Sequence, residues 1–308
     1  MNRVSIIIPT YNAEYHIKNL LNKIKHQSLK DYELIIVDST SKDKTLEIAK
    51  EYTKNIIIIP QSEFDHGGTR AKATQIATGD ILIYLTQDAL PYNIYTIENI
   101  VKIFDNMQVG AAYGQQLSYK STNLFGKHLR EFNYPNKTII RTKNDIEKYG
   151  IKTAQLSNSF AAYRKSVLME TGNFKNNLIL GEDVYTGAKI IFAGYNLVYT
   201  ADAKVYHSHS YTIWEEFKRY FDIGVFHMIE HWILDAFGKA EGEGMKYIKS
   251  ELNYLLKNNA WYLIPEFFLR NGMKYLGYKL GKNYKTLPQW IIKKMSMHYR
   301  WWDKQKQN

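Results

Sequence analysis

The sequence contains no cysteine, which excludes disulfide bridges and thiolate metal sites. No apolar run approaches the roughly 18 to 20 residues that a membrane-spanning helix needs. The first residues also lack a long apolar stretch followed by a cleavage site of small residues, so no signal peptide is predicted. These absences favour a cytoplasmic protein that is either soluble or bound peripherally to the inner face of the cell membrane.

What the sequence has in excess is positive charge and aromatic side chains. Its 308 residues carry a formal net charge of +11, which implies anionic partners such as nucleic acid, acidic lipid or phosphorylated small molecules. The 25 Tyr and 6 Trp side chains suit a core, a sugar face or a membrane interface. Composition alone does not choose among these partners.

The first 90 residues alternate between strand-like and helix-like patterns. Short apolar runs typical of buried strands occupy Val4–Ile8, Leu34–Val37, Asn55–Ile59 and Ile81–Leu85. Residues with helical periodicity or cap-rich starts separate them, which predicts an α/β fold with a mostly parallel, doubly wound central sheet flanked by helices. Such sheets bind ligands beyond the carboxyl ends of their strands, and polar residues gather at those ends.

The residue pattern changes after about residue 210, where aromatic-rich segments with helical periodicity begin. The preceding part, residues 1–210, is predicted to be the α/β domain that carries the polar strand ends. The following part, residues 211–308, is predicted to be an aromatic-rich, basic, helical extension.

Two aspartates stand at predicted strand ends. Asp38 can accept hydrogen bonds from a nucleobase or ribose hydroxyl, and a helix N-cap is its structural alternative. Asp88 can hold a hard cation, Mg²⁺ or Mn²⁺, that bridges two phosphates. Its alternative is a turn aspartate before Pro91.

Later residues offer a base and further metal ligands. Glu182 and Asp183 start a predicted helix, where a carboxylate can act as a general base or simply favour the helix dipole. His207 and His209 lie two residues apart on an extended segment, so both rings share a face. One of them can complete a metal site with Asp88, or both can line a polar strand face.

The segment Phe64–Arg70 is an unusual loop for a purely structural role. Its two glycines, Gly67 and Gly68, permit close backbone approach to a ligand. Arg70 can pair with a phosphate by a forked contact.

Taken together, these segments resemble the family-two inverting glycosyltransferases with a GT-A (Rossmann-like) fold. The resemblance covers residues 1–210 and rests on Ile7–Asn12, Val37–Thr45, Thr86–Ala89 and Glu182–Asp183. Within that family the chain is similar to the rhamnosyltransferase branch, through Phe64–Arg70, Leu85–Ala89, His207–His209, Arg219–Gly224, Lys279–Gly281 and Leu287–Pro288. The branch implies a dTDP-β-L-rhamnose donor and a glycan or lipid-linked glycan acceptor for a bacterial surface polysaccharide such as O-antigen, capsule or wall glycan.

The residues and the resemblance together predict one site. The predicted donor contacts are Pro9, Thr10, Tyr11, Asn12, Asp38, His66, Gly67, Arg70, Gln87 and Asp88. The predicted metal ligands are Asp88, His207 and His209, and the predicted catalytic residues are Asp183 and Glu182. The family's Asp-X-Asp motif is incomplete, because Thr86 and Gln87 precede Asp88, so the Mg²⁺ or Mn²⁺ rests on one motif carboxylate.

Several alternatives stay open from the sequence. The tail Trp290–Trp302 mixes rings and cations, which suits an anionic membrane surface, packing on the domain or a homodimer contact. Another UDP- or dTDP-sugar can replace the rhamnosyl donor. Two alternatives come from other classes of protein. A nucleotidyltransferase would carry a Gly-rich phosphate loop near its N-terminus, which this sequence lacks. A nucleic-acid-binding protein would carry a recognisable motif, and none is present. No nucleic acid partner is therefore predicted.

Overall fold

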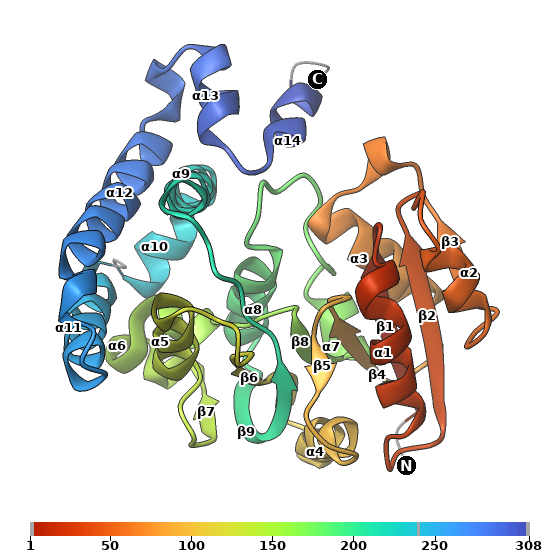
Figure 1. The fold of residues 1–308 in the computed structure, drawn as a ribbon. Coiled ribbons are helices and arrows are strands. Elements are labelled where there is room, and N and C mark those ends of the chain that lie inside the picture. The colour runs from red at the N-terminus through yellow and green to blue at the C-terminus, as the bar shows by residue number, and fades with distance from the viewer. Residues whose placement is uncertain (1–2, 239–240, 306–308) are drawn as a thin grey trace.

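The computed structural model of the chain describes residues 3–238 and 241–305. Its strands form one nine-stranded sheet in the order β3-β2-β1-β4-β8-β6-β9-β5, with β7 paired to β9 (Figure 1). The strands are β1 (Val4–Thr10), β2 (Tyr32–Asp38), β3 (Ile56–Ile58), β4 (Ile81–Leu85), β5 (Leu90–Pro91), β6 (Val109–Leu117), β7 (Ile139–Arg141), β8 (Phe160–Arg164) and β9 (Asn196–Tyr206). The helices of the first 210 residues are α1 (Glu14–Lys25), α2 (Thr45–Lys50), α3 (His66–Ile76), α4 (Thr96–Val101), α5 (Leu124–Asn133), α6 (Ile146–Tyr149), α7 (Lys165–Glu170) and α8 (Glu182–Phe192).

The N-terminal half of the sheet is parallel, as predicted. β1 pairs in parallel with β2 and with β4, and β2 pairs in parallel with β3. The register places Thr10 opposite Asp38, so two predicted site residues lie side by side where their strands end. β8, which the sequence analysis missed, runs antiparallel to both β4 and β6. The sheet is therefore mixed: β1 to β4 pair in parallel, where strands and helices alternate, and β6 also pairs in parallel with β9.

Both faces of this sheet are buried, which explains why most positions in its strands are apolar. In β1, Ile6 and Ile8 belong to the core on the side that α1 covers, and Ile7 belongs to the core on the opposite side. Helix α1 buries Ile17 and Leu20 with their periodic neighbours, which confirms the helix predicted there. A strand covered on both faces has no polar side to alternate with.

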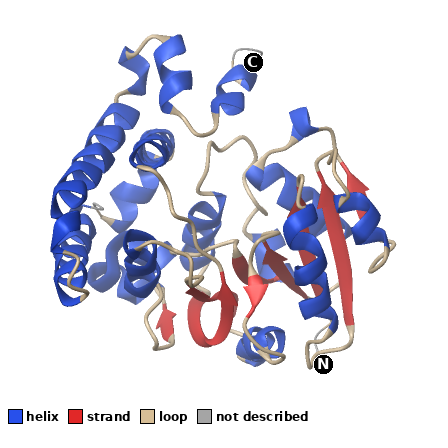
Figure 2. Cartoon of the chain, viewed as in Figure 1, coloured by secondary structure: helices blue, strands red, loops and turns tan. Residues whose placement is uncertain are grey.

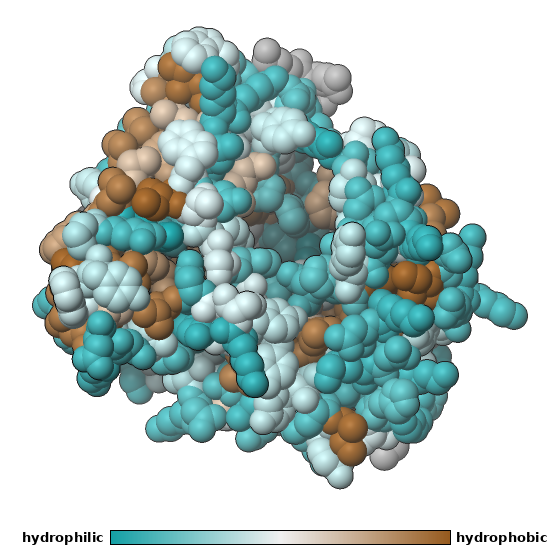
Figure 3. Space-filling view, in the orientation of Figure 1, coloured by the Kyte–Doolittle hydropathy of each residue, from teal (hydrophilic) through white to brown (hydrophobic). Residues whose placement is uncertain are grey.

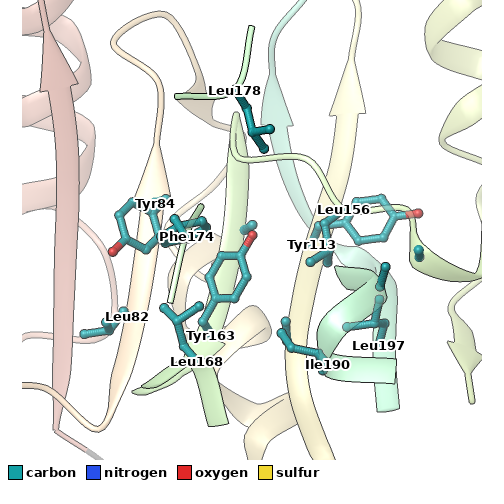
Figure 4. Packing of buried hydrophobic residues seen from close by; sticks show 14 of the residues in the cluster. Leu82, Tyr84, Tyr113, Leu156, Tyr163, Leu168, Phe174, Leu178, Ile190 and Leu197 are labelled. Atoms are coloured by element: carbon teal, nitrogen blue, oxygen red, sulfur yellow. The ribbon is translucent and has the colours of Figure 1, made fainter. Parts of the chain in front are cut away.

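Aromatic rings fill the core on the side of the sheet opposite α1, and they reach toward the strand ends. Tyr84, Tyr163 and Phe174 meet edge to face, with ring centroids 5.1 to 5.8 Å apart (Figure 4). The hydroxyl of Tyr163 donates a 2.6 Å hydrogen bond to Oδ1 of Asn158. The ring cluster thus fixes a polar side chain that the next subsection places beside Asp183.

In the C-terminal part, the secondary structure of the residues described consists of helices joined by loops (Figure 2). Its helices are α9 (Ile213–Ile229), α10 (His231–Phe237), α11 (Glu241–Lys257), α12 (Ile264–Lys282), α13 (Gln289–Met295) and α14 (Tyr299–Lys304). Phe221, Ile233, Ile292 and Trp302 from these helices join the same core as the sheet. The boundary at residue 210 stays a prediction, since the two parts share a core. Within the described residues, no helix combines the length and apolar character needed to cross a membrane.

Candidate functional site

The carboxylate of Asp38 is fixed at the end of β2. It is fully buried, and Oδ2 accepts hydrogen bonds from the hydroxyls of Thr10 at 2.9 Å and Ser41 at 2.6 Å. The backbone N–H of Ser41 donates to Oδ1 at 2.8 Å. Asp38 therefore organises the loop after β2. It is not the N-cap of α2, because Lys44 holds that position. The cap alternative is not the arrangement observed.

The loop after β1 is joined to the loop after β4. The backbone N–H of Tyr11 donates to Oε1 of Gln87 at 2.9 Å, and Nε2 of Gln87 donates to the carbonyl oxygen of Tyr11 at 3.2 Å. Asn12 follows with a φ of 47°, a left-handed conformation that asparagine tolerates. Its side-chain Oδ1 accepts from the N–H of Lys42 at 2.9 Å. Pro9 is part of β1 itself.

Asp88, His207 and His209 converge on one point. Their candidate ligand atoms all lie within 4.8 Å of one another. Oδ2 of Asp88 lies 3.5 Å from Nε2 of His207 and 3.8 Å from Nε2 of His209. One carboxylate and two imidazoles form a donor set that suits a divalent transition metal. These residues can therefore hold a cation.

Neighbouring side chains fix the tautomer of His207. Nδ1 of His207 lies 2.9 Å from Oε1 of Gln116, and this oxygen also accepts from the Arg130 guanidinium at 2.7 Å. Arginine only donates, so the oxygen of the Gln116 amide must point at both partners, and Nδ1 of His207 must carry the proton. Nε2 is then left with a free lone pair toward Asp88. Burial lowers the pKa of His207 to about 3, which keeps the ring neutral.

Asp183 lies beside Glu182 and Asn158 at the start of α8. The N–H of Val184 donates to its Oδ1 at 2.8 Å, and the N–H of Asn158 approaches its Oδ2 at 3.4 Å. Burial, reinforced by the negative charge of Glu182, raises the pKa of Asp183 to about 7. A carboxylate with that pKa accepts a proton more readily than an ordinary aspartate.

Glu182 and Arg70 form a buried ion pair. NH1 of Arg70 lies 3.1 Å from Oε1 of Glu182 and donates to the carbonyl oxygen of His66 at 2.8 Å. Burial opposes ionisation of Glu182, but Arg70 and nearby donors outweigh it, so the pKa of Glu182 is lowered. The sequence predicted that Arg70 contacts a phosphate. The structure pairs Arg70 with Glu182, both of them buried, and its contact with a phosphate stays a prediction.

The segment after Phe64 also differs from the predicted loop. Asp65 caps α3, which begins at His66, and its side chain accepts from the N–H of Gly68. A Cβ added to Gly67 would lie 1.9 Å from the carbonyl oxygen of Lys175. Gly67 therefore permits close approach of another part of the chain, and its contact with a donor stays a prediction.

The predicted residues belong to one connected network. From Asp183, contacts run through Asn158, whose neighbour Ser157 accepts a 2.8 Å hydrogen bond from Nε2 of Gln116. Gln116 leads to His207 and so to Asp88. From Gln87, the hydrogen bonds of Tyr11 and Thr10 continue the network to Asp38. The three predicted aspartates therefore lie along one edge of the sheet, the edge at which β2 and β4 end and the antiparallel β8 begins.

A cavity of about 820 Å³ opens beside this edge, and the hollow is visible in the space-filling view (Figure 3). Tyr11, Ser39 and His66 line it on one side. The segment from Met297 to Lys304 lines the other side. This C-terminal wall was missed by the sequence analysis, because more than 200 residues separate it from the loops that it faces.

The C-terminal wall is held in place by several contacts. Oδ2 of Asp222 accepts from the N–H groups of Met297 at 2.9 Å and His298 at 3.3 Å. Nζ of Lys304 donates to the carbonyl oxygen of Phe64 at 2.9 Å. Trp302 is buried, with 3% exposed. Of the alternatives left open for the tail, packing on the domain describes this segment.

Comparisons with known proteins show the family of this chain. Residues 5–172 match the family model described as glycosyl transferase family 2. Over 305 residues the chain is 46% identical to the O-antigen chain rhamnosyltransferase WbaN of Salmonella anatum, covering 98% of this chain and 96% of that protein. The O-antigen chain rhamnosyltransferase RfbN of Salmonella typhimurium is also 46% identical, over the same shares of both chains.

Solved structures share the fold. The mannosyltransferase PcManGT from Pyrobaculum calidifontis, in complex with GDP-Man and Mn²⁺, superposes with a TM-score of 0.59 at 18% identity, over 99% of this chain and 87% of that one. S. aureus TarS 1–349 in complex with UDP-GlcNAc gives a TM-score of 0.54 at 16% identity, over 92% of each chain. These likenesses confirm the predicted GT-A fold class.

Proposed function

We propose, since the chain belongs to glycosyl transferase family 2, that this glycosyltransferase moves L-rhamnose from dTDP-β-L-rhamnose to a hydroxyl of an O-antigen precursor. Two proteins named as O-antigen chain rhamnosyltransferases support the sugar and the product, because each is 46% identical over nearly the whole chain. The structural observation that carries the proposal is the network that joins Asp38, Asp88 and Asp183 along one sheet edge.

The nucleotide of the donor is assigned to the Asp38 side of the site. Tyr11, Ser39 and His66 line the cavity next to Asp38, and the loop after β1 is held by Gln87. Asp38 acts by shaping this loop, since its oxygens are engaged by Thr10 and Ser41. The Met297–Lys304 wall closes the other side of the cavity and supplies additional cationic side chains.

Asp88, His207 and His209 are the residues that would hold a divalent cation, Mg²⁺ or Mn²⁺. When bound, such a cation neutralises charge on the leaving diphosphate. The neutral His207 ring, with Nε2 available, matches the state that a metal ligand requires. This donor set replaces the missing first acidic residue of the Asp-X-Asp motif.

Asp183 is the general base of the proposed reaction. Its carboxylate accepts the proton of the acceptor hydroxyl while that oxygen bonds to the anomeric carbon, and the bond to the diphosphate breaks on the opposite face. Configuration at the anomeric carbon is thereby inverted. Glu182 serves as a positioning residue, because its charge raises the pKa of Asp183 and its carboxylate is held by Arg70.

The test is product analysis with purified protein, Mn²⁺ and a panel of dTDP- and UDP-sugars. Acceptor-dependent release of dTDP from dTDP-β-L-rhamnose is expected, with an α-linked product. Clear preference for another donor would refute the rhamnose assignment and leave the family intact. Release of pyrophosphate would instead identify the rival nucleotidyltransferase.

A further inference from the structure

One face of α12 exposes an unbroken apolar surface. It begins in the 3-10 turn Trp261–Leu263 and continues along the helix. We call it the α12 stripe; its large side chains are Trp261, Tyr262, Phe268, Leu269, Tyr275 and Leu276. They recur every seven residues, which keeps them on one side of a helix. The structure describes every residue from 261 to 276, and the other exposed positions there are only Pro265 and Gly272.

The stripe cannot turn inward, because the opposite face of α12 is already packed. A Cβ added to Gly277 would lie 2.5 Å from the carbonyl oxygen of Phe217, and one added to Gly281 would lie 2.0 Å from that of Phe221. These distances show that the backbones of α9 and α12 touch. Helix α12 lies on the outer edge of the molecule, and hydrophobic residues gather over that edge (Figures 1 and 3).

The exposed charged residues at the two ends of the stripe are positive. Exposed lysines stand at both ends, Lys257 before it and Lys279 and Lys285 after it. The acidic side chain in the stretch, Glu266, is paired with the buried Arg270 at 2.6 Å. A two-fold contact between two copies would bring lysines of one copy toward those of the other. An anionic surface complements the same lysines without that repulsion.

The dimensions favour a helix lying flat on a surface. The 19 residues of α12 extend about 28 Å at 1.5 Å per residue, but within residues 3–238 and 241–305 no helix is apolar enough to span a bilayer. Trp and Tyr have an apolar body and a polar tip, which suits the boundary between lipid headgroups and tails. Lysines beside such rings suit anionic headgroups.

We propose that the α12 stripe docks this protein on an anionic lipid bilayer, with its rings and aliphatic side chains entering the interface. The lysines at its two ends pair with the lipid phosphates. This surface differs from the predicted tail, whose Trp302 is buried in the domain. The proposal does not depend on which sugar the enzyme transfers.

Co-sedimentation with vesicles of phosphatidylcholine alone, or with one third phosphatidylglycerol, tests the proposal. The full chain should sediment with the phosphatidylglycerol vesicles and be released by high salt. The double variant Phe268→Ser/Tyr275→Ser should lose most of this binding, and Lys257→Glu/Lys279→Glu/Lys285→Glu should lose its preference for the anionic lipid.

The matched control is Tyr15→Ser, which removes a ring that is 89% exposed on α1, away from the stripe. It should bind vesicles like the unaltered chain. Thermal unfolding and transfer to a water-soluble acceptor should be unchanged in all variants, which separates this proposal from the proposed function. Vesicle binding unaffected by the stripe variants would overturn the proposal, and so would a vesicle-free dimer that these variants dissociate without any lipid binding.

Discussion

Gln116 Oε1 accepts a 2.9 Å hydrogen bond from the Nδ1–H of His207, and the Arg130 guanidinium holds the amide in that orientation. The pair connects β6 to the segment after β9 and directs Nε2 of His207 toward Asp88. Gln116, which is not itself a predicted metal ligand, thereby sets the tautomer of the candidate metal ligand His207.

Replacing Gln116 should therefore weaken metal binding. Gln116→Ala is expected to reduce Mn²⁺ affinity roughly 10- to 100-fold, measured by titration calorimetry with dTDP present. Gln116→Glu should recover much of the loss, since a carboxylate also accepts from Nδ1. Equal Mn²⁺ affinity in all three proteins would show that the tautomer does not matter.

The Asp183→Asn variant should lose transfer and keep its donor. Loss of the proton acceptor is expected to lower kcat roughly 100- to 10,000-fold, while the Kd for dTDP stays unchanged by calorimetry. A correctly folded variant that retained substantial turnover would mean that another group is the base.

The rate should depend on pH through Asp183. Because burial and Glu182 raise its pKa to about 7, the base is protonated and inactive below that pH, so kcat should fall with acidification from about pH 8 to pH 6. The pKa values of His207 and His209 are lowered, so their protonation belongs to more acidic solutions.

A charge change next to Asp183 provides the control for that profile. Glu182→Gln removes a negative charge that raises the pKa of Asp183, so the acid limb should move to lower pH. Thermal unfolding must accompany the measurement, since the substitution leaves Arg70 without its buried partner. An acid limb that stays in place would assign the titration to another group.

The C-terminal wall should matter for the donor rather than for the chemical step. Asp222→Ala removes the acceptor of the Met297 and His298 N–H groups, and hydrogen bonds to a buried carboxyl group of this kind correspond to about tenfold in affinity. The KM for the donor should rise by about that factor, with a smaller change in kcat. Asp235→Ala, at a carboxylate that is 72% exposed, should leave the KM unaltered.

Two glycines of α12 should respond to alanine in opposite directions. Gly272 is exposed and has nothing near an added Cβ, so Gly272→Ala should stabilise the protein by about 1 kcal/mol through helix propensity. Gly281→Ala places a Cβ against the carbonyl oxygen of Phe221 and should destabilise it by about 1 to 3 kcal/mol. Denaturant unfolding measures both, and a stabilised Gly281→Ala would contradict the close contact of α9 and α12.

Local pattern determined the first half of the sheet and its polar strand ends. A short, mostly apolar run such as Val4–Ile8, followed by a helical pattern, predicts a strand buried on both faces. Thr10 and Asp38 then stand where two such strands end. The same reasoning missed β8, because five residues with two alanines carry little strand signal of their own. Its neighbours β4 and β6 supply the hydrogen bonds that make it a strand.

The amino-acid sequence by itself determined the parallel βα units, the α/β class and the residue types that could meet at one sheet edge, because periodicity and strand ends are local properties. Only the tertiary structure decided that Arg70 pairs with Glu182, that Gln116 orients His207, and that Met297–Lys304 closes the cavity. These contacts join segments from tens to more than 200 residues apart. Burial and chain topology select such partners, so these contacts cannot be predicted from the pattern of neighbouring residues.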